Sequence, residues 1–223
     1  MQGKLVEQDP HDEPASVLLE RIRAEREQLT REGKIKRNKS ESVIFRRDNS
    51  YYEIRGGAEV CIDDELPFDI PENWAWARIW LIFNLHAGRF VQAQDIHTES
   101  EGRFPCYGGN GLRGYVDNYN RDGSYQLIGR QGALCGNINF ADGQFYATEH
   151  AIVVEYFCDV NVHWMGYFLT ALNLNQYSTA TAQPGLAVAT VNEVLFPLPP
   201  ISELHRIVER IEKLVSHIGK YRE

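Results

Sequence analysis

The chain has 223 residues and a formal net charge of −8 at pH 7, with 43% hydrophobic and 24% charged residues. This length suits one domain with appendages, and the composition is that of an ordinary globular protein with a sizeable core. The acidic balance argues against a protein that grips nucleic acid unaided, because phosphate neutralisation dominates non-specific affinity. No apolar run is long enough to span a bilayer and the charged N-terminus does not resemble a signal peptide, so we expect a cytoplasmic protein without membrane contact.

The positions of cysteine and lysine bear on metal binding, on disulfides and on how the chain could recognise nucleic acid. The four cysteines, at positions 61, 106, 135 and 158, are widely spaced, which predicts neither a metal site nor a disulfide framework. Between Lys39 and Lys213 there is no lysine, so every fixed cation in that range is arginine. The planar guanidinium suits bidentate recognition of guanine or phosphate better than an ammonium group does.

Residues 1–66 are predicted to hold an N-terminal helix, a basic linker and a segment that leads into the main domain. Pro14 is typical of a helix start, with Asp12 as the expected N-cap, and Gly33 is expected to end the helix. Five apolar residues follow helical spacing: Ala15, Leu18, Leu19, Ile22 and Leu29. The runs 43–45 and 51–54 predict a hairpin around residues 48–50.

Residues 67–200 are predicted to form the main, mostly β domain. Three tryptophans are expected on one face of a strand and in the core: Trp74, Trp76 and Trp80. The short apolar runs 126–128 and 151–154 are typical of strands. Asn161 is expected to cap a helix whose buried face repeats every four residues: Trp164, Phe168 and Leu172. A loop at 178–186 and an extended segment at 195–200 follow.

The stretch from residue 105 to residue 151 contains two glycine-rich turns, "YGGNGLRGY" and "GRQGALCGN", and a third turn, "ATEHA". Glycine permits positive φ and close backbone approach, and loops held on a rigid sheet are where recognition usually occurs. The candidate recognition residues are polar or aromatic: Tyr107, Asn110, Arg113, Arg130, Gln131, Asn137, His150 and Gln183. For Arg113 and Arg130 the alternative is an intramolecular salt bridge.

The period changes after residue 200. Six apolar residues follow 3-4-3-4-3 spacing, which is an a/d seam: Ile201, Leu204, Val208, Ile211, Val215 and Ile218. Such a stripe would be exposed on a lone helix. Residues 201–223 are therefore predicted to begin a coiled-coil helix in which five residues contact a partner helix: Leu204, Val208, Ile211, Val215 and Ile218.

Three alternative functions remain open. The run 109–114 matches the GxGxxG pattern of nucleotide-binding folds, although the turn-rich sequence after it is not helical. Cys106 or Cys135 with His150 as base, oriented by Glu149 or Asn110, would make a cysteine hydrolase. A pure protein-interaction module would use only the seam.

The three turns, followed in order by "LNLNQY", "TAQPGL", "PLPP" and the heptad helix, resemble the specificity (S) subunit of type I restriction-modification enzymes. The resemblance covers nearly the whole chain. It is to one target-recognition domain and the start of the conserved helix. Because family S subunits carry two recognition domains, we expect a half-subunit or a fragment. With this resemblance the predicted fold class is α+β: a mainly β domain with a few helices, plus a C-terminal coiled-coil-type helix.

The resemblance implies a non-catalytic subunit that reads double-stranded DNA by direct readout. The implied protein partners are a modification subunit that binds S-adenosylmethionine and methylates adenine, and a restriction subunit that uses ATP. A second half-subunit is a further candidate partner. We expect no cofactor on this chain, since both cofactors belong to the partner subunits.

Overall fold

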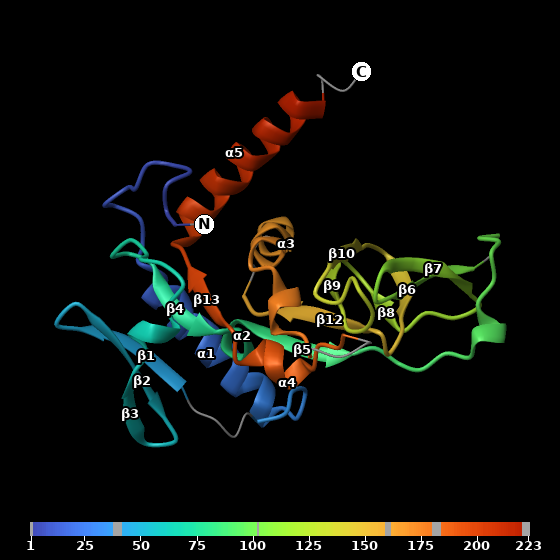
Figure 1. Cartoon of the computed structure of the whole chain (residues 1–223), viewed down its shortest axis with the longest axis horizontal. Coiled ribbons are helices and arrows are strands. Elements are labelled where there is room, and N and C mark those ends of the chain that lie inside the picture. The colour runs from blue at the N-terminus through green and yellow to red at the C-terminus, as the bar shows by residue number, and fades with distance from the viewer. Residues whose placement is uncertain (1, 38–41, 102, 159–161, 180–183, 220–223) are drawn as a thin grey trace. The chain divides into compact units, whose positions relative to one another are not determined.

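The computed structural model describes residues 2–37, 42–101, 103–158, 162–179 and 184–219. The chain divides into two compact units, each built from separated parts of the sequence (Figure 1). The first unit comprises Met1–Ile82, Phe157–Trp164 and Val194–Glu223, and the second comprises Phe83–Tyr156 and Met165–Glu193. The predicted ranges 1–66, 67–200 and 201–223 follow chain order, whereas the units follow packing. The range 67–200 contributes to both units.

Helix α1 (Ala15–Arg31) opens the first unit. The apolar stripe is confirmed for Ala15, Leu18, Leu19 and Ile22, which are all buried, whereas the fifth predicted member, Leu29, is half-buried. The predicted N-cap is wrong. Pro14 occupies the cap position, and the carboxylate of Asp12 instead accepts hydrogen bonds from Arg206 at 2.5 and 3.1 Å. Gly33, with φ of +71°, follows the end of the helix as predicted.

Strands β1 (Ser42–Arg47), β2 (Ser50–Arg55) and β3 (Ala58–Cys61) form an antiparallel meander. The predicted hairpin is confirmed, since Arg47 pairs with Ser50 across a two-residue turn. Asp48 and Asn49 have φ of +51° and +65°. Positive φ at both central residues is the type I′ geometry whose twist matches that of the flanking strands, and Asp and Asn tolerate it better than most residues.

A buried ion pair ties the meander to strand β4 (Ala75–Arg78). The side chains of Arg78 and Glu53 are 4% and 1% exposed, and Arg78 Nη2 lies 2.6 Å from Glu53 Oε2. Burial by itself would raise the pKa of the Glu53 carboxyl, but hydrogen bonds from Arg78, Ser42 and Arg55 lower this pKa to about 2. Glu65 also accepts from Arg78 at 2.7 Å, so the buried guanidinium has two carboxylate partners.

The three tryptophans are buried, which confirms their place in the core, but they do not share a strand face. Trp76 lies in β4, which pairs with β13 (Leu195–Leu198), whereas Trp80 lies in the short helix α2 (Ile79–Ile82). Every residue of α2 is buried. An apolar run buried on all sides has no alternation to distinguish strand from helix, and the sequence prediction failed for that reason.

Helix α5 (Ile201–Gly219) corrects the seam prediction. Leu204 and Val208, at 0% and 6% exposure, are buried within the chain and are not free to contact a partner helix. The helix start is held by Glu203, whose carboxylate accepts from Trp74 Nε1 at 2.8 Å. Farther along, Val215 is 56% exposed. The first half of the seam therefore belongs to the core, and the side chain of Ile218 lies outside the described residues.

The second unit contains two four-stranded sheets, with strand orders β10-β9-β12-β5 and β7-β6-β11-β8. The first sheet is antiparallel throughout, and in the second β6 and β11 are parallel. The strands are β5 (Phe83–Ala87), β6 (Phe104–Gly108), β7 (Gly111–Val116), β8 (Arg121–Asp122), β9 (Tyr125–Gly129), β10 (Ile138–Ala141), β11 (Gln144–Ala147) and β12 (Ala151–Tyr156). The strands predicted at 126–128 and 151–154 are confirmed as β9 and β12.

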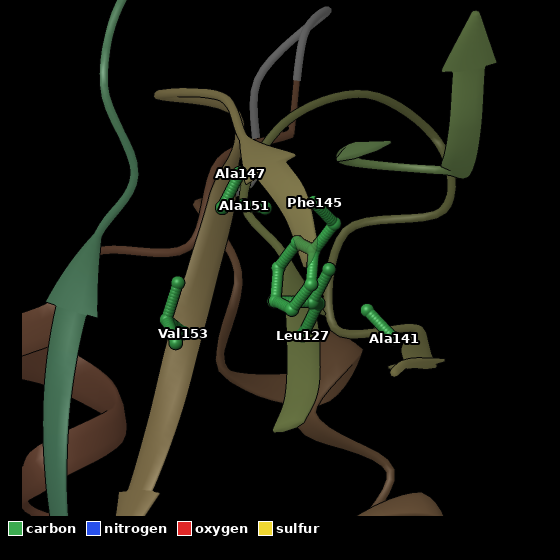
Figure 2. Packing of buried hydrophobic residues seen from close by; sticks show 6 residues of the cluster. All are labelled: Leu127, Ala141, Phe145, Ala147, Ala151 and Val153. Atoms are coloured by element: carbon green, nitrogen blue, oxygen red, sulfur yellow. The ribbon is translucent and has the colours of Figure 1, made fainter. Parts of the chain in front are cut away.

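A cluster of buried side chains joins these strands. Its members come from β9, β10, β11 and β12, and Figure 2 shows all six: Leu127, Ala141, Phe145, Ala147, Ala151 and Val153. The rings of Tyr107 and Tyr125 pack edge-on against Phe145, with centroids 5.6 and 5.9 Å away. The cluster holds β9, β11 and β12 at the ends that carry the polar turns.

The remaining elements are short. They are α3 (Val162–Ala171), α4 (Val188–Asn192) and the 3-10 turns η1 (Asp63–Glu65), η2 (Ala93–Asp95) and η3 (Leu174–Tyr177). Trp164 and Phe168 of α3 are buried as predicted, whereas Asn161 lies outside the described residues. Strands predominate, with five α-helices in the described ranges, which confirms the α+β class. No helix in those ranges has both the length and the apolar character needed to cross a membrane.

Candidate nucleic-acid interface

The three turns predicted as a recognition surface meet at one groove in the second unit. The groove has a volume of about 470 Å³ and is lined by residues from all three turns and from the loop before α4: Gly109, Asn110, Arg113, Gln131, Gly132, His150, Pro184 and Gly185. Four of the eight candidate recognition residues therefore line one concave surface. In the sequence they span 41 residues, from Asn110 to His150 inclusive, and the strand pairings bring them together.

Glycine at two positions allows these turns to approach each other. A Cβ atom on Gly129 would lie 2.1 Å from the carbonyl oxygen of Gly109, closer than any real contact. A Cβ on Gly109 would lie 3.0 Å from the carbonyl oxygen of His150. Backbone hydrogen bonds then fix the arrangement, because Arg130 N donates to His150 O and Leu186 N donates to Arg130 O, both at 2.8 Å. Backbone hydrogen bonds between the turns therefore hold the walls of the groove, and the side chains project from a rigid base.

The two candidate arginines differ in how they are held. Arg113 is exposed on β7, and its aliphatic part covers Gly108, where an added Cβ would meet Arg113 Cδ at 2.4 Å. Within the described ranges its guanidinium has neither an ion pair nor a hydrogen bond. Arg130 donates from Nη1 to Glu149 O at 2.9 Å and is half-buried. Arg130 therefore positions the third turn, and Arg113 is available to a ligand.

Several buried polar atoms in the three turns and in the neighbouring strand β10 have no hydrogen-bond partner among the described residues, and His150 is the one of their residues that lines the groove. They are Arg130 Nε, Asn139 Nδ2, Glu149 Oε2 and His150 Nδ1. Glu149 Oε1 lies 3.1 Å from His150 Nε2, so each of these two side chains has one partnered and one unpartnered polar atom. A buried donor or acceptor without a hydrogen bond destabilises the fold by about 1–3 kcal/mol. These atoms therefore favour a bound water or ligand that supplies the missing hydrogen bonds.

Asn139 was not among the candidate recognition residues. Asn139 lies in β10, and a Cβ on Gly111 would meet its Oδ1 at 3.0 Å, which places the amide beside the first turn. Asparagine is disfavoured in strands, so its presence between Ile138 and Phe140 was the available signal.

Three further candidates, Tyr107, Arg130 and Asn137, do not line the groove. Tyr107 packs its ring against the core cluster, and burial raises the pKa of its hydroxyl. Asn137 is exposed but lies outside the groove lining. Gln183 lies outside the described residues.

The alternative catalytic sites lack the arrangement they need. Residues 111–116 form strand β7, where the nucleotide-binding pattern requires a helix. Cys106 and Cys135 are buried, and burial raises the pKa of the Cys106 thiol, away from the reactive thiolate. In the described ranges no hydrogen bond joins either thiol to His150, and no three His, Cys, Asp or Glu side chains gather as metal ligands would.

Comparison with known proteins identifies the family. The family described as "Type I restriction modification DNA specificity domain" matches residues 71–221, which is more than half of the chain. The chain belongs to this family. Among curated specificity subunits from Escherichia coli, that of type I restriction enzyme EcoprrI is 44% identical over 142 residues, covering 61% of this chain and 35% of the relative. That of EcoAI is 28% identical over 250 residues, covering 98% of this chain and 38% of the relative.

Solved structures agree on the fold of this specificity domain. The S subunit of a type I restriction-modification system from M. genitalium has a TM-score of 0.55 at 20% identity, covering 71% of this chain and 45% of that one. The HsdS subunit from Thermoanaerobacter tengcongensis also has a TM-score of 0.55, at 17% identity, covering 71% and 42%. The specificity domain spans little more than a third of the length of the two curated relatives.

Proposed function

We propose that this specificity domain reads double-stranded DNA through the groove formed by its three turns. The observation that carries the proposal is the groove itself, which is lined by Asn110, Gln131, His150 and Arg113. Among the described residues the guanidinium of Arg113 has no ion-pair partner. Arginine, asparagine and glutamine are the side chains that pair bidentately with guanine and adenine in the major groove. Family membership supports the same use of this surface.

The proposal extends to an assembly in which other subunits perform the chemistry. One similar solved structure concerns complex assembly of the type I restriction-modification system, and it supports partners of this kind. We assign methylation with S-adenosylmethionine to a modification subunit and ATP use to a restriction subunit, in the cytoplasm, with no cofactor or catalytic residue on this chain. The net charge of −8 supports this division, because most of the electrostatic grip on DNA would then come from a partner.

The experiment that tests the function is a genome-wide methylation map of the host with and without the gene. We expect deletion to remove methylation from one bipartite motif, and expression of the intact gene to restore it. If every methylated motif survives the deletion, the assignment to a specificity subunit in that host is wrong.

Arg113 and Arg130 are predicted to differ in DNA binding. In the assembled complex, Arg113→Ala should lose about 1–3 kcal/mol of discrimination at one base pair and leave the others unchanged. Arg130→Ala should weaken binding to all sequences, because Arg130 holds the backbone of the third turn. The measurement is affinity for every single-base variant of the target at two salt concentrations. An even loss for Arg113→Ala, with a salt slope lowered by about one unit, would make Arg113 a phosphate anchor.

The distal half of α5 is predicted to hold a partner helix. The double variant Ile211→Lys with Val215→Lys should keep the thermal stability of the chain and abolish association, because Val215 is 56% exposed and Ile211 is partly exposed. Leu204→Lys should instead unfold the first unit, since Leu204 is 0% exposed. Sedimentation and thermal denaturation distinguish these effects, with Glu212→Lys, an exposed charge change on the same helix, as the control. Unchanged sedimentation of the double variant would remove α5 as the partner surface.

A further inference from the structure

A phenylalanine in the second unit is largely exposed and lines a hollow separate from the groove. The side chain of Phe90, in the segment after β5, is 70% exposed, and Val215 follows at 56% among the described large apolar side chains. Single exposed apolar residues are common on protein surfaces and need no explanation by themselves. Phe90 differs in two ways: hydrogen bonds fix the backbone that carries it, and the exposed Arg89 precedes it in the sequence.

Three hydrogen bonds hold this segment against the turn between β11 and β12. Gly88 N donates to Ala151 O and Arg89 N donates to Ala147 O, both at 2.9 Å. The hydroxyl of Tyr146 donates to the carbonyl oxygen of Phe90, also at 2.9 Å. A Cβ on Gly88 would lie 2.2 Å from Thr148 O, so only glycine permits this approach. The phenyl ring is thus presented by a rigid backbone and not by a loosely held loop.

The same backbone contacts limit how far Phe90 lies from the groove residue His150. Arg89 forms a parallel β-bridge with Thr148, and the groove residue His150 follows two positions later. A bridge of about 5 Å and two residue steps of at most about 3.8 Å each put Arg89 Cα within about 13 Å of His150 Cα, and one further step puts Phe90 Cα within about 17 Å. The larger distance corresponds to about five base-pair steps of duplex DNA. Arg89 itself is exposed, and within the described ranges no carboxylate pairs with it.

We propose that Phe90 is a specificity-determining residue that contacts the C5-methyl group of a thymine, while Arg89 contacts a neighbouring phosphate. This inference rests on the proposed function. The polar groove residues suit guanine and adenine edges in the major groove, where the thymine methyl is the apolar feature that a phenyl ring can recognise. A ring inserted between base steps would act from the minor groove, away from such readers. A fixed, hydrated ring gains free energy when it buries a methyl group.

The test replaces single thymines of the target with uracil, which removes only the methyl group. With the wild-type complex, we expect uracil at one position to weaken binding about fourfold, the factor expected for burial of one methyl-sized group. Phe90→Ala should bind the thymine and uracil duplexes equally at that position, and Phe90→Leu should retain part of the difference. Phe140→Ala is the control for loss of an exposed phenyl ring elsewhere in the second unit, because Phe140 is 43% exposed and lies on β10.

The outcomes separate the two proposals. If the wild-type complex binds its target no better than random duplex, the proposed function fails before Phe90 is tested. If binding is specific but Phe90→Ala keeps the full thymine-to-uracil difference at every position, the inference about Phe90 is wrong and the function stands. An equal loss of affinity on thymine and uracil duplexes, with a reduced DNA bend, would make Phe90 a wedge and would also overturn the inference. Unchanged thermal denaturation of Phe90→Ala confirms that the fold is intact.

Discussion

Replacing Arg78 with alanine is expected to lower the free energy of unfolding by about 3–5 kcal/mol, the usual cost of removing one partner from a buried ion pair. Glu53 would remain 1% exposed without the guanidinium that lies 2.6 Å from its carboxylate. Arg55 and Ser42 would still donate to it, but Arg55 is 45% exposed and compensates only in part. Chemical denaturation of wild type and variant at pH 7 measures the difference.

The control for Arg78→Ala is Arg47→Ala in the same meander. Arg47 pairs with Glu59 at 2.5 Å, yet the two side chains are 48% and 42% exposed, and such a pair contributes about 0–1 kcal/mol. Equal losses of stability in the two variants would show that the buried pair stabilises the fold no more than the exposed pair does.

The same pair gives stability a predictable pH dependence. The pKa of Glu53 is about 2 in the folded chain, against an ordinary value of 4.5 for a glutamate side chain. A lowered pKa means that this contribution is fully present above about pH 4.5 and is lost as the pH falls through about 2. In Arg78→Ala the pKa of Glu53 should rise, so acid should denature the variant at a higher pH than the wild type. Denaturation profiles between pH 2 and pH 6 check this.

Alanine at Gly129 is expected to disrupt the groove and to cost about 1–3 kcal/mol or more of stability. Its Cβ would lie 2.1 Å from the carbonyl oxygen of Gly109. Because that oxygen is a backbone atom, no side-chain rotation relieves the clash, and one turn must shift by about 1 Å to reach ordinary contact. The shift would move Arg130 and Gln131, which follow directly, relative to Asn110. We therefore expect sequence-specific binding to be lost more completely than with any single side-chain truncation. Thermal denaturation and target affinity measure the two effects.

Gly185→Ala is the matched control for this prediction. Gly185 also lines the groove, but among the described residues a Cβ there would meet Thr179 Oγ1 at an ordinary 3.6 Å. This variant should remain stable and keep its specificity. If the two alanine variants behave alike, the close approach of the turns does not shape the site.

Elements set by neighbouring residues were predictable from the sequence. The hairpin at 48–50 follows from residues that tolerate positive φ between two apolar runs. Helix α1 follows from Pro14, the apolar spacing and Gly33, and strands β9 and β12 follow from short apolar runs beside turns. The three turns that line the groove were predictable for the same reason, because glycine turns bearing polar side chains are a local signal.

Whether a side chain can contact a ligand or a partner protein depends on residues far away in the sequence. Only the tertiary structure shows this. Leu204 fits a coiled-coil seam as well as Val215 does, yet packing of α5 on the first unit buries only Leu204. Arg113 and Arg130 both flank glycine turns, but only Arg130 is held, by the carbonyl oxygen of Glu149, 19 residues away. Sequence spacing reports which residues share a face of one element. Which of those faces meets another part of the chain is set by long-range packing, and that determines which residues are left for a ligand or a partner.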